Sequence, residues 1–213
     1  MRIRLCLAAL SLVGGAGLTT LSAPAASGAT CSDIDVVAAR GTFEPGTLGA
    51  IVGDPVHSAL QRKLTGRNLS SYRVNYPADL SPTSAAQGNT DLVNHVNSQA
   101  AACPNQRFIL VGYSQGANVV DNSIGISSDG AVVGSPIAAT IPTALTPRVA
   151  AVLLFGNPIR ALGRSVTGTY QSRTIDFCAQ GDPICQSGGT DVLAHLSYTS
   201  DAGAAADFAA TKV

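Results

Sequence analysis

The sequence predicts an α/β fold of three layers, in which helices cover both faces of a central five-stranded parallel sheet. Three observations favour it: short apolar runs alternate with segments of helical periodicity, the strongest runs are apolar at successive positions, and one run leads through Gly-x-Ser-x-Gly into a helix. Strands that are apolar on both faces need cover on both sides. We therefore expect functional side chains beyond the carboxyl ends of the strands.

The elements follow from apolar runs and from the residues that end them. Pro77 ends one strand and Gly156-Asn157-Pro158 another, while Leu92, Val93 and Val96 repeat at helical spacing. Ser200 or Asp201 can cap the final helix. The predicted strands cover 33–39, 70–76, 108–111, 149–155 and 171–177, the helices cover 48–64, 85–103 and 115–122, and 123–147 is mostly irregular.

Residues 1–29 read as a secretory signal peptide. Arg2 and Arg4 precede an apolar run over 5–18, and small residues at 27–29 offer a cleavage site, with 23–25 as an alternative. A retained membrane anchor is the other interpretation, but the run is short for a span. We expect a secreted, extracellular protein whose single domain covers 30–213.

The charge balance argues against nucleic acid as a partner. Two of the 13 basic residues leave with the signal peptide, so 11 remain against 13 acidic ones. Charged residues make up only 12% of the chain, which suits a protein that meets uncharged or apolar material outside the cell. We expect a monomer without stable membrane insertion.

Four cysteines remain after Cys6 leaves with the signal peptide. An even number in an exported chain indicates two disulfides with three alternative pairings. The short loop between Cys178 and Cys185 favours that pair, which leaves Cys31 with Cys103 and a long closure of roughly 4 kcal/mol on the chain-entropy model. No histidine stands at zinc-ligand spacing from them, so we expect no metal.

Ser114 is the candidate nucleophile. A buried strand runs into Gly112-Tyr113-Ser114-Gln115-Gly116, a tight strand-to-helix turn that would push the serine hydroxyl clear of the sheet. Side chains at Gly112 or Gly116 would clash there. The alternative is a plain glycine-rich turn.

His195 is the candidate general base, because His57 and His95 lie within predicted helices, where solvent-facing or core-edge roles are usual. His195 follows the last strand, although it could simply pack against its leucine neighbours. Activity should then fall below about pH 6–7, where a histidine becomes protonated.

Three aspartates compete as the orienting acid. Asp176 lies within a strand and is expected to be structural, and Asp191 is expected to cap a turn. Asp182 lies inside the expected Cys178–Cys185 ring, which would hold a carboxylate still beside an imidazole. The resulting order of serine, aspartate and histidine is that of the α/β-hydrolases. Backbone N–H groups of Gln115 and Thr42 are the candidate oxyanion donors, Thr42 being alternatively an ordinary turn residue.

These motifs together resemble the cutinase family. The resemblance rests on Arg40-Gly41-Thr42-x-Glu44-Pro45-Gly46, Gly112-Tyr113-Ser114-Gln115-Gly116, Cys178-x-x-Gly181-Asp182-x-x-Cys185 and His195-Leu-x-Tyr198. It implies a small serine esterase of compact α/β-hydrolase fold, without metal or organic cofactor and without a long lid over the serine. It also implies Ser114, Asp182 and His195 as catalytic residues, Thr42 and Gln115 as the oxyanion hole, and the disulfides Cys31–Cys103 and Cys178–Cys185. The abundant alanine and the signal peptide are similar to the bacterial branch.

The loops beside the expected site mix apolar and polar residues. Family members that attack polymers or lipids surround the serine with apolar loops, a role for which this chain offers Leu80, Val192, Leu193 and Leu196. Its polar neighbours are Ser81, Thr83, Ser84, Gln186 and Ser187, with Gly188 and Gly189 as flexible points.

We therefore expect a carboxylic-ester hydrolase for short to medium acyl esters, with cutin-like polyesters or lipids as further substrates. The alternatives are a polysaccharide deacetylase of the acetylxylan type, and a secreted lipid-binding or antigenic protein without turnover.

Overall fold

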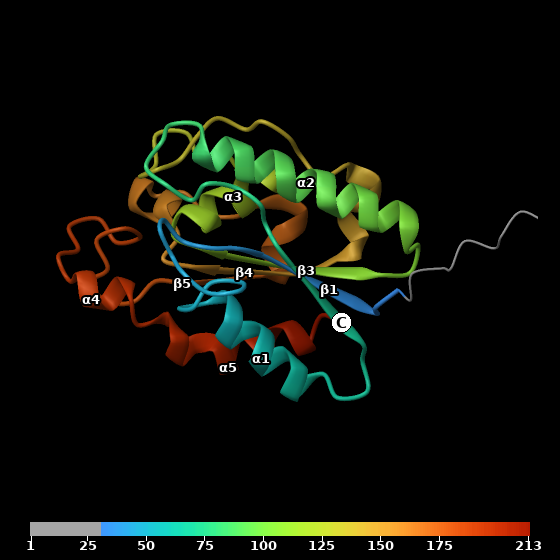
Figure 1. The fold of residues 1–213 in the computed structure, drawn as a ribbon. Coiled ribbons are helices and arrows are strands. Elements are labelled where there is room, and N and C mark those ends of the chain that lie inside the picture. Colours follow the sequence, from blue (N-terminus) through green and yellow to red (C-terminus); the bar gives the residue numbers. More distant parts are fainter. Residues whose placement is uncertain (1–30) are drawn as a thin grey trace, which may run out of the picture. The chain divides into compact units, whose positions relative to one another are not determined.

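A computed structural model describes residues 31–213 (Figure 1), so the expected signal peptide over 1–29 lies outside the described residues. Within 31–213 five parallel strands form one sheet in the order β2-β1-β3-β4-β5. This confirms the predicted sheet. The strands are β1 (Ile34–Ala39), β2 (Leu69–Arg73), β3 (Arg107–Tyr113), β4 (Val149–Phe155) and β5 (Thr174–Phe177).

Helices cover both faces of this sheet, as Figure 1 shows. Along β1, Val37 belongs to the core packed by α2 and α3, whereas Val36 and Ala38 belong to the core packed by α1 and α5. Because both faces are buried, the inner strands β1, β3 and β4 are mostly apolar at successive positions, whereas the edge strands β2 and β5 are only partly buried. The helices are α1 (Gly53–Lys63), α2 (Ser84–Ala102), α3 (Gln115–Ser123), α4 (Val192–His195) and α5 (Ala202–Ala210), with 3-10 helices at Thr143–Arg148, Pro158–Leu162, Gly168–Arg173 and Tyr198–Asp201.

The predicted helix over 48–64 begins five residues late, at Gly53. The cause is local: the Asp54 carboxylate accepts the N–H groups of Thr47 and Leu48 and holds 47–52 in turns. Starting at Gly53 also puts Pro55 in the first helical turn, where its missing N–H costs nothing.

Other boundaries also differ from the prediction. The edge strand β2 ends at Arg73 because its one neighbour, β1, ends at Ala39. The first part of the predicted strand over 171–177 is a 3-10 turn, closed by a hydrogen bond from the Thr174 hydroxyl to the Tyr170 carbonyl. The final helix starts at Ala202, and neither Ser200 nor Asp201 gives it a side-chain cap.

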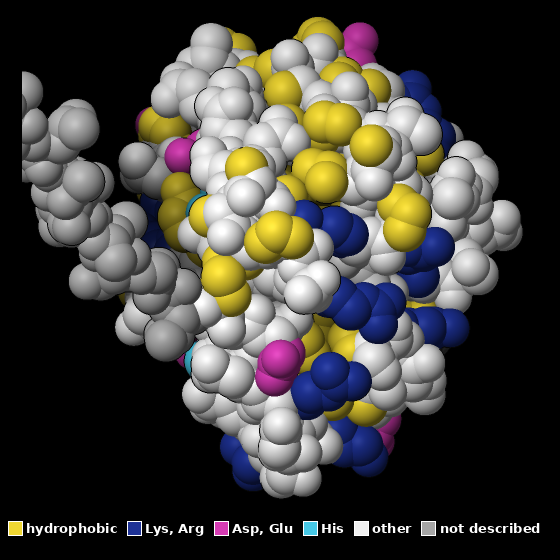
Figure 2. Space-filling model, turned by 90° about the vertical axis from the view of Figure 1, so that its right-hand side faces the viewer, with side chains coloured by type: hydrophobic (Ala, Val, Ile, Leu, Met, Phe, Trp, Pro, Cys, Tyr) yellow, Lys and Arg dark blue, Asp and Glu magenta, His cyan; other side chains and the backbone are white. Residues whose placement is uncertain are grey.

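The two ends of the parallel strands differ in character. Arg107, Arg148 and Arg173 stand at or just before the starts of β3, β4 and β5. Figure 2 views this side of the molecule, where Lys and Arg side chains gather among scattered hydrophobic ones. The carboxyl ends lie on the opposite side and carry the candidate site.

Candidate active site

Ser114 occupies the turn between β3 and α3 with a positive φ of 53°. Its N–H donates to the Phe155 carbonyl at 2.9 Å, which ties the turn to β4. A Cβ at Gly112 would stand 2.6 Å from the Gly116 carbonyl oxygen, and one at Gly116 would collide with the carbonyl of Ala39. The two glycines are needed because strand and helix nearly touch, and the serine conformation is the strained one expected of such a turn.

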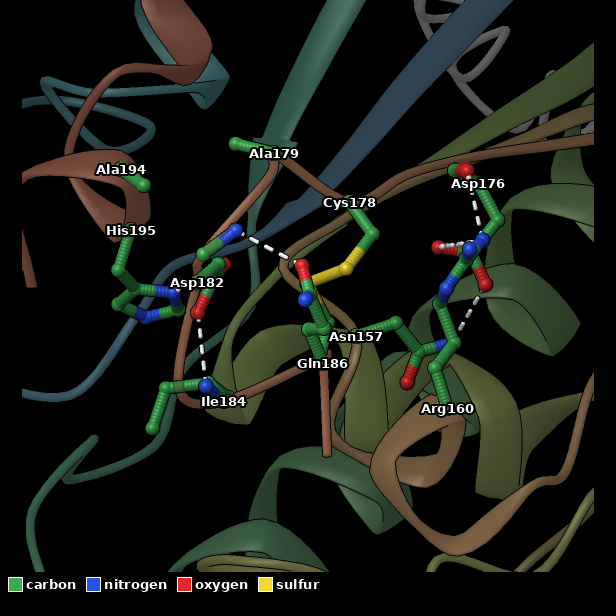
Figure 3. The surroundings of a disulfide bond; sticks show 12 residues. Asn157, Arg160, Asp176, Cys178, Ala179, Asp182, Ile184, Gln186, Ala194 and His195 are labelled. Carbon is green, nitrogen blue, oxygen red and sulfur yellow. Dashed lines mark hydrogen bonds and ion pairs between the residues drawn. A yellow bond between two sulfur atoms is a disulfide. The ribbon is translucent and has the colours of Figure 1, made fainter. Parts of the chain in front are cut away.

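Hydrogen bonds join Ser114, His195 and Asp182 in one chain. Ser114 Oγ lies 2.9 Å from His195 Nε2, and His195 Nδ1 lies 2.8 Å from Asp182 Oδ2. Figure 3 shows the imidazole beside the carboxylate. Because a carboxylate only accepts, Nδ1 carries the hydrogen and Nε2 is free to accept the serine hydroxyl. The structure thus brings Ser114 together with His195, which lies 81 positions later in the sequence, and with Asp182, which lies 13 positions before His195.

Asp182 is fully buried and firmly held. Its Oδ1 accepts the Ile184 N–H at 2.7 Å, and the disulfide Cys178–Cys185 closes a ring around it. The other disulfide, Cys31–Cys103, is also present, so both pairs are those that the sequence favoured. With its position fixed, the carboxylate selects one imidazole tautomer.

The imidazole of His195 is restrained from two more sides. The Tyr113 ring stacks against it with centroids 5.1 Å apart, and the Tyr113 hydroxyl donates to the His195 carbonyl at 2.6 Å. A Cβ at Gly156 would come within 2.8 Å of His195 Cε1, so the end of β4 passes directly beneath the ring. Burial raises the pKa of the Tyr113 hydroxyl, which keeps it a donor.

The other acids have structural roles, as predicted. Asp191 caps α4 by accepting the N–H of Leu193 at 2.9 Å. Asp176 accepts from Asn157 at 3.1 Å, and burial raises its pKa to about 6.

The backbone N–H groups of residues 41–43, just after β1, differ in whether they have an acceptor. The Gly41 N–H donates to Glu44 Oε2 at 2.7 Å, and the Phe43 N–H donates to the Ala78 carbonyl at 2.7 Å. No acceptor within residues 31–213 takes the N–H of Thr42, which lines the same cavity as Ser114. The N–H of Gln115, at the start of α3, is among the donors that a helix leaves unpaired. Both groups can serve a developing oxyanion.

The serine and the histidine open onto a cavity of about 420 Å³ with mostly apolar walls. Two of the expected apolar residues, Leu80 and Leu196, line it. Val192 and Leu193 do not, although both are exposed. The expected polar neighbours do not line it either, and Ser84 is instead buried against the Gln115 side chain. The rest of the wall consists of Thr42, Phe43, Glu44, Pro45, Ile51, Tyr113, Val132, Val133 and Ile184.

Comparisons with known proteins assign the chain to a family. The model of the cutinase family matches residues 30–213. The chain belongs to the cutinase family. It is 45% identical to a cutinase of Kineococcus radiotolerans over 81% of this chain and 58% of that longer protein. It is 39% identical to the carboxylesterase Culp1 of Mycobacterium tuberculosis over 95% of this chain and 94% of that one. The resemblance seen in the motifs, including its bacterial character, is confirmed, and the chain is a carboxylic-ester hydrolase of the cutinase type.

Solved structures agree on the fold. A Trichoderma reesei cutinase in complex with a phosphonate inhibitor shares 34% identity at a TM-score of 0.69, over 85% of this chain and 76% of that one. An acetyl xylan esterase aligns at a TM-score of 0.73 over 86% and 99%, and its 23% identity speaks for the fold alone.

Sequence reasoning missed much of this cutinase cavity. Phe43 adjoins the predicted Thr42 and Ile184 lies inside the predicted disulfide ring, so proximity could have identified both. Val132 and Val133 lie in the segment read as irregular, and no local pattern indicates that it returns to the serine.

Two further findings concern the described part of the chain. In residues 31–213 no three His, Cys, Asp or Glu side chains gather closely enough to hold a metal ion. The same residues include no helix of the length and apolarity that a membrane crossing requires.

Proposed function

We propose that this cutinase-family chain is an exported serine esterase that cleaves short to medium acyl esters through an acyl-enzyme on Ser114. The hydrogen-bonded chain of Ser114, His195 and Asp182 at the wall of an apolar cavity of about 420 Å³ carries this proposal. Export is supported by the charged start and apolar run within 1–29 and by two disulfides, which persist in oxidising compartments.

In the acylation step, Ser114 Oγ attacks the ester carbonyl carbon while His195 Nε2 takes the hydroxyl proton. Asp182, at 2.8 Å from Nδ1, stabilises the imidazolium that forms. The carbonyl oxygen becomes an oxyanion and receives the N–H groups of Thr42 and Gln115. The tetrahedral intermediate then collapses, and His195 gives its proton to the departing alkoxide.

Deacylation repeats these roles with water. His195 Nε2 takes a proton from a water molecule as its oxygen attacks the acyl carbon of the ester on Ser114. Collapse of the second intermediate breaks the bond to Ser114 Oγ, which recovers its proton from His195. The acid leaves and the free enzyme is restored.

The cavity wall favours an acyl chain longer than acetyl. Leu80, Val132 and Ile184 offer apolar contact along the cavity, and each methylene that leaves water contributes about 0.8 kcal/mol. A deacetylase would have little use for these walls. Comparing kcat/KM on p-nitrophenyl butyrate, tributyrin and acetylated xylan separates the two activities, and a preference for acetylated xylan would overturn this acyl-chain assignment.

The nucleophile is tested by Ser114→Ala. We expect the variant to lose about 10⁴-fold or more in kcat on p-nitrophenyl butyrate and to lose labelling by a fluorophosphonate probe. The matched control is Ser127→Ala, a serine that does not line this cavity, and this variant should label like the original chain. A Ser114→Ala protein that still hydrolyses and labels would refute the proposed role of Ser114.

A further inference from the structure

We infer that Tyr198 is a positioning residue for the esterase reaction, acting through Asp182, and that its hydroxyl sets the strength of His195 as a base. This inference rests on the proposed function. The Tyr198 hydroxyl lies 2.5 Å from Asp182 Oδ2, the same oxygen that lies 2.8 Å from His195 Nδ1. The carboxylate oxygen that orients the imidazole is therefore shared with a phenol.

The direction of the tyrosine bond is fixed by its surroundings. The Tyr198 oxygen already accepts the Ala179 N–H at 3.0 Å, and its single hydrogen faces the carboxylate. The whole side chain is buried, and burial, together with the bond to Asp182, raises the pKa of the hydroxyl. The phenol thus stays protonated and donates to Asp182 throughout the working pH range.

This donor changes the chemistry of Asp182 because a buried carboxylate depends on the hydrogen bonds that it receives. Oδ1 receives the Ile184 N–H, and Oδ2 receives His195 and Tyr198. Without the phenol, the imidazole would be the only one of these donors left to Asp182 Oδ2. The carboxylate would then attract the Nδ1 proton more strongly. His195 Nε2 would then hold a proton more tightly and would be a less available base at mildly acidic pH.

The ring and the hydroxyl of Tyr198 have separable tasks. The ring packs edge-on against His195 and Phe155, with centroids 6.2 Å and 6.1 Å away. Tyr198 Cε2 would lie only 3.0 Å from a Cβ on Gly156, so the ring packs tightly against the backbone there. Tyr198→Phe keeps this packing and removes only the hydroxyl, so the variant isolates the effect of the bond to Asp182.

The test is the pH profile of kcat/KM on p-nitrophenyl butyrate for Tyr198→Phe. We expect the acid limb of the kcat/KM profile to move up by about half to one pH unit. We also expect the plateau value of kcat/KM to fall about tenfold, as is typical when a hydrogen-bond partner that orients a functional residue is removed. Tyr170→Phe is the matched control, because Tyr170 is also buried but bonds Thr146 in the opposite core. Its profile should coincide with that of the original chain.

A second variant covers poor folding of Tyr198→Phe. Site-specific replacement of Tyr198 by 3-fluorotyrosine keeps the bond and makes the hydroxyl a stronger donor, so the acid limb should move to lower pH. A purely structural role would lower the urea midpoint and leave both pH profiles unchanged, and that result would overturn the inference. Activity that survives Ser114→Ala would instead count against the proposed nucleophile, so the two failures are distinguishable.

Discussion

Two histidine–aspartate pairs lie at opposite ends of the sheet with nearly equal distances and burial. His195 and Asp182 approach to 2.8 Å, with side chains 13% and 0% exposed, and His95 and Asp35 approach to 2.7 Å at 13% and 3%. The first pair faces a cavity beyond the carboxyl ends of the strands. The second joins α2 to the start of β1. Distance and burial alone therefore do not identify a general base.

The difference lies in which imidazole nitrogen remains free. His195 uses Nδ1 for its carboxylate and presents the outer Nε2 to a serine. His95 is hydrogen-bonded to Asp35 through its outer nitrogen Nε2, and its ring stacks on Tyr72 with centroids 3.5 Å apart. The serine beside this pair, Ser70, donates to the carboxylate at 2.6 Å and not to the imidazole. A histidine base needs an unprotonated nitrogen within hydrogen-bond reach of the hydroxyl, and space for a substrate.

The largest expected effect separates the two histidines. His195→Gln should lower kcat on p-nitrophenyl butyrate by about 10⁴-fold or more, because within residues 31–213 only His195 Nε2 is hydrogen-bonded to Ser114 Oγ. His95→Gln should keep activity within about twofold but lower the free energy of unfolding by about 3 kcal/mol, since Asp35 loses a buried partner. Steady-state kinetics and urea unfolding measure both, and a large activity loss in His95→Gln would end the distinction.

Each disulfide lies near one of the two pairs. Cys31–Cys103 is next to Ser32, which is hydrogen-bonded to Ser70, the serine that donates to Asp35, and Cys178–Cys185 encloses Asp182. Replacing Cys31 and Cys103 by serine opens a closure of 72 residues and should lower the free energy of unfolding by about 4 kcal/mol with little change in kcat. Replacing Cys178 and Cys185 opens one of 7 residues, with a loss of about 2–3 kcal/mol and a larger fall in kcat. Equal kcat values for the two variants would show that the ring does not orient Asp182.

Asp176 shows what happens to a buried aspartate without a histidine partner. Its pKa rises from 3.8 to about 6 on folding, mainly through burial, so the folded protein binds the proton more tightly. This contribution to stability is complete below pH 4 and is lost as the pH rises through 6. Relative to Asp176→Asn, the original chain should lose up to about 3 kcal/mol between pH 4 and pH 7. Urea unfolding across this range checks it, and a pH-independent difference would contradict it.

The smallest of these effects concerns the space in front of His195. Leu80 lines the cavity and is 68% exposed, so Leu80→Ser should raise KM for p-nitrophenyl butyrate about fivefold with kcat nearly unchanged. Leu162→Ser is the control, because Leu162 is also exposed but does not line the cavity. An equal rise in KM for both would mean that the apolar wall does not bind the acyl chain.

The residues that sequence analysis located are those with a local signature. Gly112 and Gly116 mark the nucleophile turn, the cysteine spacing marks the ring around Asp182, and the apolar run of β4 has the bounds that were predicted. These signals can be recognised in a short stretch of sequence, because backbone geometry and strand burial constrain which residues can stand there.

The rest could not be predicted because it depends on packing between distant segments. Nothing near Val132 indicates that it lines the cavity of Ser114, and nothing near Tyr198 indicates which carboxylate its hydroxyl meets. His95 looked like an ordinary helical residue, and its partner Asp35 is 60 positions away. Only the assembled sheet brings these groups together.

The positive φ of Ser114 means that the residue required for activity at this position is not the residue that would make the protein most stable. Glycine tolerates that conformation, whereas an alanine there remains strained by about 1 kcal/mol. Calorimetry should therefore rank an inert Ser114→Gly protein above Ser114→Ala in melting temperature, and the reverse order would show a relaxed turn. Selecting stabilised variants of this chain by melting temperature alone would therefore favour replacement of Ser114.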